Sequence, residues 1–136
     1  MHDLSHQMMA LQTLVLRQLM KGLEGTEIST GQPKVLAYLK SHEGRVQKEV
    51  AAACLLEPGS LTVLLNRMER QGMIERRARE GDRRARCIYL TDYGQELAER
   101  VVARFYEVER RAFEGISDED RAAFARICGA VAENLK

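Results

Sequence analysis

The chain has 136 residues, of which 45% are hydrophobic and 30% are charged, and its formal net charge is +1. This length suits one domain with one core, and this balance of side chains excludes an intrinsically disordered protein. No stretch approaches the ~18 consecutive apolar residues of a transmembrane helix, so we expect no membrane span.

The first ten residues lack a basic leader followed by an apolar run, so we expect no signal peptide and a cytoplasmic location. Cys54, Cys87 and Cys128 lie far apart and form no Cys-x-x-Cys pair, which argues against a disulfide framework or a zinc site. His2 and His6 have the i, i+4 spacing of a metal clamp. They stand near a chain end with no cysteine nearby, and we expect neither a metal nor another cofactor.

Positive charge is concentrated in one block of the sequence. Residues 67–86 hold eight arginines against four acidic residues, a local net charge of +4. Residues 1–66 are balanced, and residues 87–136 carry a net charge of −3. The distribution of charge matters more than its sum when a protein meets a polyanion, so the arginine block points to a nucleic-acid partner despite the low total.

Hydrophobic periodicity predicts two helices at the start of the chain. Leucine, methionine and valine recur at steps of three and four over about residues 3–22, which indicates one amphipathic helix that ends at Gly22. Thr30 is the expected N-cap of a second helix. Pro33 falls in the first turn of that helix, where a missing N–H costs little.

The middle of the chain predicts a helix, a tight turn and a second helix. The first covers residues 47–54, and the turn covers residues 55–57. Pro58 is well placed to begin the next helix, which Gly72 ends in a left-handed conformation. Helical periodicity stops there.

Two strands and two helices complete the predicted elements. Residues 73–79 and 86–90 predict strands, and Glu80-Gly81-Asp82 supplies the turn that joins them as an antiparallel hairpin. Thr91 or Asp92 caps a long helix that ends at Gly115, and Ser117 caps a last one.

These elements predict a mainly α protein with a small β-hairpin wing. A winged helix-turn-helix lobe at about residues 30–91 sits on a helical dimerisation frame at about residues 3–22 and 92–136, and residues 1–136 form a single domain. The two frame segments carry apolar stripes at opposite ends of the chain. A domain this small buries both more fully against a symmetric copy, so we expect a homodimer. The alternative is that both segments pack on their own lobe.

The helix that begins at Pro58 has two faces of different chemistry. Its apolar residues face the core, so at about 100° per residue the opposite face carries small and polar side chains. Such a slim face enters a major groove ~12 Å wide without steric conflict. Asn66 can pair bidentately with adenine, and Val63 can pack on a thymine methyl. The candidate DNA-binding residues of this helix are Ser60, Thr62, Val63, Asn66, Arg67 and Arg70.

The hairpin adds a second basic element. Its tip carries four arginines, one of which is Arg79. The other three are the candidate DNA-binding residues of the hairpin: Arg83, Arg84 and Arg86. Arginine loses less hydration than lysine on entering a narrow minor groove, where the negative potential is enhanced. Asp82 is unfavourable beside phosphate unless it orients an arginine through a charge-assisted hydrogen bond, and we expect it to have this wing-orienting role.

Three segments together resemble the multiple-antibiotic-resistance regulator (MarR) family. Residues 64–76, LLNRMERQGMIER, are similar to the end of its recognition helix. Residues 82–84, DRR, and 90–94, LTDYG, are similar to its wing and to the start of its fifth helix. The order and lengths of the elements also match, so the resemblance covers nearly the whole chain.

This resemblance implies a homodimeric transcriptional regulator with two winged lobes on a palindromic operator of double-stranded DNA, expected to be a repressor. It implies that Arg84 reaches the minor groove and that Ser60, Thr62 and Asn66 face the major groove. Two positions depart from the family pattern. Val63 stands where many members carry a polar or basic residue, and Val46 stands where a Ser or Thr cap is usual.

Many members of the family respond to a small aromatic or phenolic ligand in a cleft between frame and lobe, and the resemblance implies that such a ligand relieves repression. Oxidant-sensing members carry a reactive cysteine in the first helix. This chain has none there, so we expect no oxidation switch.

The alternative function is a winged-helix module that binds protein and not DNA, with arginines that merely solvate a surface. Salt separates the two, because binding through many phosphates weakens steeply with added salt and a mostly apolar interface does not. No Gly-rich phosphate loop, nucleophile elbow or His-Glu-x-x-His motif occurs, so we expect no enzyme.

Overall fold

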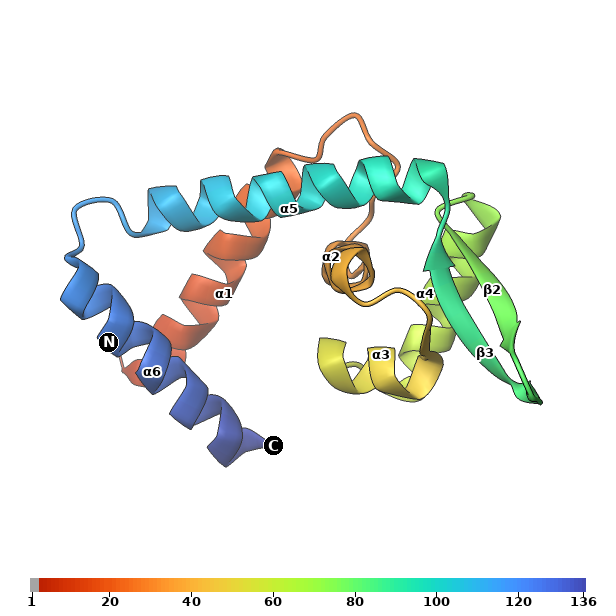
Figure 1. Ribbon diagram of the computed structural model, residues 1–136. Helices are drawn as coiled ribbons and strands as arrows, with labels where there is room; N and C mark the ends of the chain where they lie inside the picture. Colours follow the sequence, from red (N-terminus) through yellow and green to blue (C-terminus); the bar gives the residue numbers. More distant parts are fainter. Residues whose placement is uncertain (1–2) are drawn as a thin grey trace.

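The computed structural model describes residues 3–136, apart from the side chain of Arg83. It confirms the predicted fold class, because helices dominate and one small antiparallel sheet stands at the end of the molecule (Figure 1). In chain order the elements are α1 (Leu4–Lys21), α2 (Gln32–Ser41), β1 (Arg45–Val46), α3 (Gln47–Cys54), α4 (Pro58–Arg70), β2 (Ile74–Arg79), β3 (Asp82–Leu90), α5 (Asp92–Ala112) and α6 (Asp118–Leu135).

Helix α5 connects two parts of the molecule. Its first half packs on α2 and the sheet, and its second half runs out to the turn that leads into α6 (Figure 1). Helix α1 crosses α5, where the guanidinium Nε of Arg104 donates to the carbonyl oxygen of Gln18 at 2.9 Å. The same guanidinium fills the space beside Gly22, where an added Cβ would come within 1.9 Å of Nε. One arginine thus ties the end of α1 to the middle of α5.

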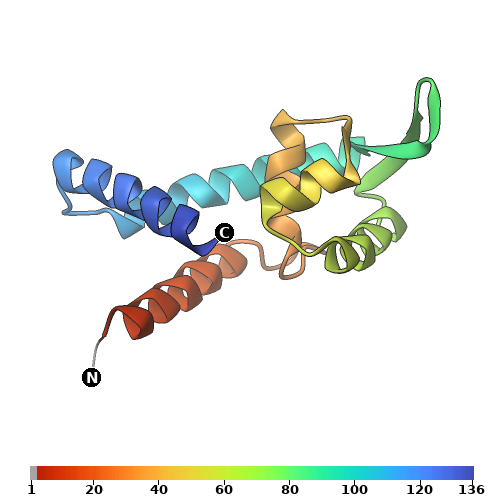
Figure 2. The same cartoon turned by 90° about the horizontal axis from the view of Figure 1, so that it is seen from below.

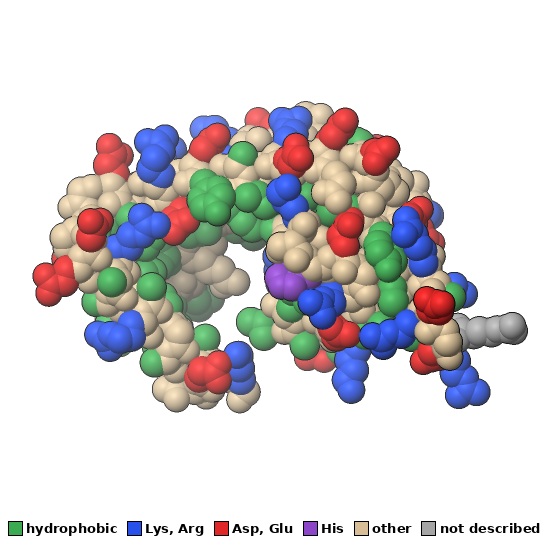
Figure 3. Space-filling view, in the orientation of Figure 1, with side chains coloured by type: hydrophobic (Ala, Val, Ile, Leu, Met, Phe, Trp, Pro, Cys, Tyr) green, Lys and Arg blue, Asp and Glu red, His purple; other side chains and the backbone are tan. Residues whose placement is uncertain are grey.

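The hydrophobic core lies in the lobe formed by α2, α3, α4, the sheet and the first half of α5. Leu36, Leu61 and Ile88 are fully buried there, and Val101 is the last buried residue of α5. Within the described chain α6 has no buried residue. The space-filling view shows hydrophobic side chains along the inner side of an arch between α6 and the lobe (Figure 3). The frame of a single chain therefore leaves much apolar surface in water.

Several helix boundaries lie where capping chemistry predicts them. The Thr91 hydroxyl accepts the N–H of Gly94 at 3.0 Å, and the Ser117 hydroxyl accepts the N–H of Asp120 at 3.1 Å. Pro58 is the first residue of α4, and Gly72 follows that helix with φ of +77°. The two hydroxyls satisfy a backbone donor, the proline lacks one, and the glycine permits a left-handed conformation. Each effect depends on the residue type at one position, so it can be predicted from the sequence.

The predicted cap of the second helix is wrong. Gly31, with φ of +95°, is the N-cap of α2 in place of Thr30, and no side chain bonds there. The buried Gln32 supplies the missing polar contacts. Its Oε1 accepts the N–H of Ser29 at 3.0 Å, and its Nε2 donates to Oε1 of Gln71 at 2.8 Å. A buried amide bonded to the loop before α2 and to the residue that follows α4 thus fixes the entry to α2.

The sheet contains a strand that the sequence did not predict. Strand β1 pairs antiparallel with β3, with Arg45 opposite Ile88 and Val46 opposite Cys87, and the strand order is β1-β3-β2. Val46 is also the N-cap of α3 and makes no side-chain capping bond, as its apolar side chain implies. The hairpin therefore rests on the start of α3 through a backbone ladder.

Gly94 offers a test of the contact between α5 and the turn that precedes the sheet. An added Cβ would lie 1.9 Å from the carbonyl oxygen of Met73, which accepts the N–H of Thr91 at 3.1 Å. We expect Gly94→Ala to lower the free energy of unfolding by about 2–3 kcal/mol, measured by urea titration. Gly59→Ala is the control, because no atom lies within 4 Å of its added Cβ. Equal stability of the two variants would contradict this reading of the contact.

Candidate nucleic-acid interface

Helix α4 presents one polar face to solvent. Its apolar face is fixed on the core by Leu61, Leu65 and Met68, all fully buried. On the opposite face Val63 is 70% exposed. The other candidate residues of the helix, Ser60, Thr62, Asn66, Arg67 and Arg70, are also exposed. Seen from below, α3, α4 and the hairpin gather at one end of the molecule (Figure 2). The structure therefore brings the helix candidates together on one accessible face.

Helix α3 braces α4 through a tight turn and a side-chain bond. Leu55 adopts φ of +54° in that turn, the one positive φ of a non-glycine residue in the described chain. The Gln47 amide donates to the Thr62 hydroxyl at 2.5 Å, and this hydroxyl donates to the Pro58 carbonyl at 3.0 Å. The Thr62 hydroxyl therefore already helps to set the angle between the two helices. Sequence reasoning did not find Gln47, because this bond joins two elements.

Asn66 is also held by a neighbouring element. Its Oδ1 accepts a hydrogen bond from Nη1 of Arg76 on β2 at 2.9 Å. The Nε of Arg76 lies 4.0 Å from a carboxylate oxygen of Glu69, one turn along α4 from Asn66. Arg76 was counted in the basic block but was not a candidate site residue. Its place at the start of a strand directly after the helix is the signal that could have suggested a contact back to α4.

The hairpin tip contains a bulge on the strand that carries the arginines. Ala78 pairs with Arg86 and Arg79 pairs with Asp82, so three residues of β3 have no counterpart on β2. Two of these three unpaired residues are Arg83 and Arg84. The side chains of Arg79, Arg84 and Arg86 are exposed, and that of Arg83 lies outside the described part of the structure. The bulge places arginines at the projecting end of the wing.

Asp82 bonds to the main chain within the bulge. Its Oδ1 accepts the backbone N–H of Arg84 at 3.0 Å, and the described side chains give it no contact with a guanidinium. An aspartate that bonds the backbone two residues ahead forms a compact turn. The residue thus orients the main chain at Arg84, and its expected role toward an arginine head group stays a prediction, because the side chain of Arg83 lies outside the described part of the structure.

A second arginine of β2 is committed within the sheet. The guanidinium of Arg77 lies over the ring of Tyr89, 4.2 Å from the centroid, and donates to the carboxylate of Glu75 at 2.8 Å through Nε. The hydrogen bond with Glu75 raises the pKa of Arg77. This guanidinium is therefore held against the sheet, although its side chain is 59% exposed.

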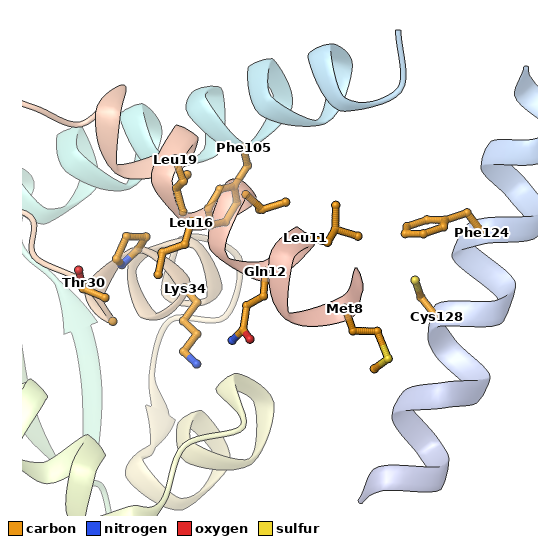
Figure 4. A pocket seen from close by; sticks show the side chains of 13 residues that line it. Met8, Leu11, Gln12, Leu16, Leu19, Thr30, Lys34, Phe105, Phe124 and Cys128 are labelled. Carbon is orange, nitrogen blue, oxygen red and sulfur yellow. The ribbon is translucent and has the colours of Figure 1, made fainter. Parts of the chain in front are cut away.

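A separate apolar cleft lies between the frame and the lobe (Figure 4). Its volume is about 600 Å³, and Leu16, Phe105 and Phe124 are among the hydrophobic side chains that line it. The polar part of the lining comes from Gln12, Thr30 and Lys34. A mostly apolar cleft with a few polar groups on one side is typical of a small-molecule site.

The cysteines lie in different environments. Cys54 and Cys87 are buried, and Cys128 is exposed beside the cleft. Burial raises the pKa of the Cys54 thiol although Lys34 lies near enough to oppose the shift. His2 of the possible metal clamp lies outside the described residues. Over residues 3–136 no group of three His, Cys, Asp or Glu side chains could hold a metal ion. In the same range no helix is both long enough and apolar enough to cross a bilayer.

Comparison with known proteins identifies relatives along the whole chain. A family model described as the MarR family matches residues 21–85. The HTH-type transcriptional regulator PecS of Dickeya dadantii is 30% identical over 125 residues, which cover 90% of this chain and 75% of PecS. The HTH-type transcriptional repressor MdtR of Bacillus subtilis is 26% identical over 98% of this chain and 86% of its own. The Staphylococcus aureus MepR–DNA complex superposes with a TM-score of 0.91 at 23% identity, over all of both chains.

The bond from Asp82 to the backbone of Arg84 predicts how tightly the tip is held. We expect Asp82→Ala to speed tryptic cleavage after the tip arginines by roughly fivefold, because the loss of one hydrogen bond favours local opening. Asp82→Asn keeps the accepting oxygen and is expected to be cleaved like the wild type. Gel or mass analysis of a time course measures both rates. If both variants were cleaved faster than the wild type and at the same rate, the charge of Asp82, and not this bond, would control the opening of the tip.

Proposed function

The chain belongs to the MarR family of transcriptional regulators, and from this premise we propose that it represses transcription as a homodimer bound to a palindromic DNA operator. The observation that carries the proposal is the exposed polar face of α4 beside an arginine-tipped wing. Both elements pack on the core of the same lobe. These are the two parts that a winged helix-turn-helix needs to contact neighbouring grooves of one duplex.

Helix α4 supplies the contacts to base edges in this proposal. Asn66 pairs with adenine, Val63 packs on a thymine methyl, and Ser60 contributes a hydroxyl. Arg67 and Arg70 lie at the basic end of α4 and neutralise phosphates or contact guanine. The Thr62 hydroxyl is already bonded to Gln47 and Pro58, so its share is to hold the helix face in place.

The wing supplies the minor-groove contact. Arg84 inserts its guanidinium, and Arg83 and Arg86 contact the flanking phosphates. Asp82 keeps the main chain at Arg84 in a compact turn, which supports a fixed direction of approach. Arginine suits this role because its planar head group is weakly hydrated.

The frame supports a homodimer. In a single chain Leu14, Ile127 and Leu135 are 52%, 51% and 74% exposed, and the stripe that they belong to runs along α1 and α6. Contiguous apolar patches of this kind mark protein interfaces. A twofold copy covers them and sets two α4 helices about one DNA turn apart, ~34–36 Å, as a palindrome requires.

The cleft supports control by a small aromatic or phenolic ligand. Its walls suit an aromatic ring, and Lys34 offers a cation to a phenolate or carboxylate. Because the cleft adjoins both the frame and the lobe, a ligand that binds better to one separation of the two lobes shifts the population toward it. The protein acts without catalysis, in the cytoplasm where chromosomal DNA is accessible.

Selection of bound fragments from random double-stranded DNA tests the proposed function. An enriched palindrome would establish both sequence-specific binding and twofold symmetry. Its affinity should fall steeply as salt is added, because phosphate contacts release counterions. A failure to enrich any motif, with salt-insensitive capture of a protein partner, would favour the alternative of a protein-binding module.

Arg84→Ala tests the wing. We expect affinity for the selected operator to fall at least about tenfold at fixed salt, since each half-site loses one minor-groove guanidinium. Fluorescence anisotropy measures the affinity, and thermal unfolding checks that the dimer remains folded. Arg100→Ala removes an exposed arginine of α5, remote from the interface, and should leave affinity unchanged. Unaltered binding by Arg84→Ala would refute the assignment.

Ile127→Glu tests the frame. A carboxylate within a desolvated apolar interface is costly, so we expect this variant to be monomeric at micromolar concentration and the wild type dimeric. Light scattering after size exclusion gives the mass. Arg126→Glu places a carboxylate on the side of α6 that faces away from the apolar stripe, and this variant should remain dimeric. A dimeric Ile127→Glu would place the interface elsewhere.

A further inference from the structure

We propose that Arg76 is a positioning residue that locks the amide of Asn66 in one orientation and thereby makes α4 prefer adenine to guanine. The inference rests on the proposed function, because it assigns how one of the DNA-reading side chains achieves its selectivity. Arg76 itself makes no base contact in this scheme.

Arg76 connects the wing to the exposed polar face of α4, which we call the reading face. Arg76 lies on β2, and its backbone pairs with Ile88 of the central strand, so its Cα is fixed by the sheet. From there its side chain crosses to α4, where Nη1 donates to Oδ1 of Asn66 at 2.9 Å. Glu69 lies on the same side, with its carboxylate 4.0 Å from Nε. The guanidinium therefore spans one turn of α4 from the strand that follows it.

The chemistry of the bond fixes the amide. Arginine carries only donors, so the atom that it contacts on Asn66 must be the carbonyl oxygen. The reversed amide would set an N–H donor against the guanidinium. The bond leaves the second lone pair of Oδ1 and the N–H groups of Nδ2 available. That acceptor and donor match the N6 donor and N7 acceptor of adenine.

Guanine presents two acceptors, O6 and N7, in the same groove. A locked Asn66 sets its oxygen against guanine O6, which leaves two acceptors facing each other. An amide released from Arg76 can turn Oδ1 away from the base edge and donate from Nδ2 to O6 or N7 instead. The lock therefore acts on the choice between the two purines.

Burial argues that Arg76 is not placed for stability. Its side chain is 19% exposed, and its Nε and Nη2 atoms are buried without a hydrogen-bond partner among the described residues. Unpaired buried donors on a charged group destabilise a fold, and apolar side chains of similar length are often tolerated better at such positions. Methionine matches the apolar stem of Arg76 and lacks its donors. Arg76→Met therefore separates the amide lock from packing.

The experiment compares operators that carry adenine or guanine at the position where Asn66→Ala relaxes the base preference. Anisotropy titrations at fixed salt give the ratio of the two affinities. We expect this ratio to fall roughly three- to tenfold in Arg76→Met, the effect of losing one hydrogen bond that selects an orientation. Arg76→Lys keeps a donor-only side chain and should retain most of the preference. Arg77→Met, on the adjacent residue of β2, is the control and should keep the wild-type ratio.

A double variant tests the route. Asn66→Ala combined with Arg76→Met should relax the preference no further than Asn66→Ala alone, because both changes remove one interaction. An unchanged ratio in Arg76→Met overturns the inference and leaves the proposed function standing. So does an equal loss of affinity for both operators, which is the signature of a phosphate contact.

Two further outcomes remain decisive. A wild-type protein that binds no DNA overturns the proposed function itself. If Arg76→Met fails to fold, Arg76→Gln takes its place, since glutamine both donates and accepts and so tolerates either amide orientation. A preference that stays the same in Arg76→Gln and Arg76→Lys overturns the lock.

Discussion

The seating of α4 on the lobe is the contact on which the interface depends. Leu61, Leu65 and Met68 are fully buried, and the burial of each such side chain stabilises the fold by about 1.5–3 kcal/mol. Because they recur every three or four residues, their burial leaves the opposite side of the helix as a rigid polar row. Bonds from Gln47 and Arg76 then hold two members of that row from α3 and β2. The groups that would meet a duplex are thus ordered in the free protein, which lowers the entropy lost on binding.

Charge within the arginine block is sorted by position. Glu69 and Glu75 lie close to the guanidinium groups of Arg76 and Arg77 on β2, so these two cations are partly neutralised by carboxylates of the protein itself. Other exposed arginines lie at the end of α4 and on the bulged wing tip. The local net charge of +4 therefore combines two arginines of β2 that lie beside carboxylates with a further group at the end of α4 and on the wing tip. This sorting concentrates the field where a polyanion would approach.

Local chemistry was sufficient to predict most of the framework. The start of α4 at Pro58, the caps of α5 and α6, and the exposed row of α4 follow from helical period and capping, which act within a few residues. Strand β1 was not predictable in this way, because two residues show no period and their partners lie on β3. The prediction of the N-cap of α2 was wrong for a related reason, because Gln32 bonds to Gln71, which is distant in the sequence. The bonds that hold the reading face are of the same kind, spanning 15 and 10 residues between separate elements.

The length of α5 has a mechanical consequence. Its 21 residues, at about 1.5 Å each, make a rod of roughly 31 Å that starts in the lobe and ends at the frame. Arg104 fastens α1 to the middle of that rod. A tilt of about 10° at the frame would swing the far tip by roughly 5 Å, more than the ~3.4 Å between successive bases of a strand. Leverage of this size lets a change too small to disturb the core move α4 out of register with its groove.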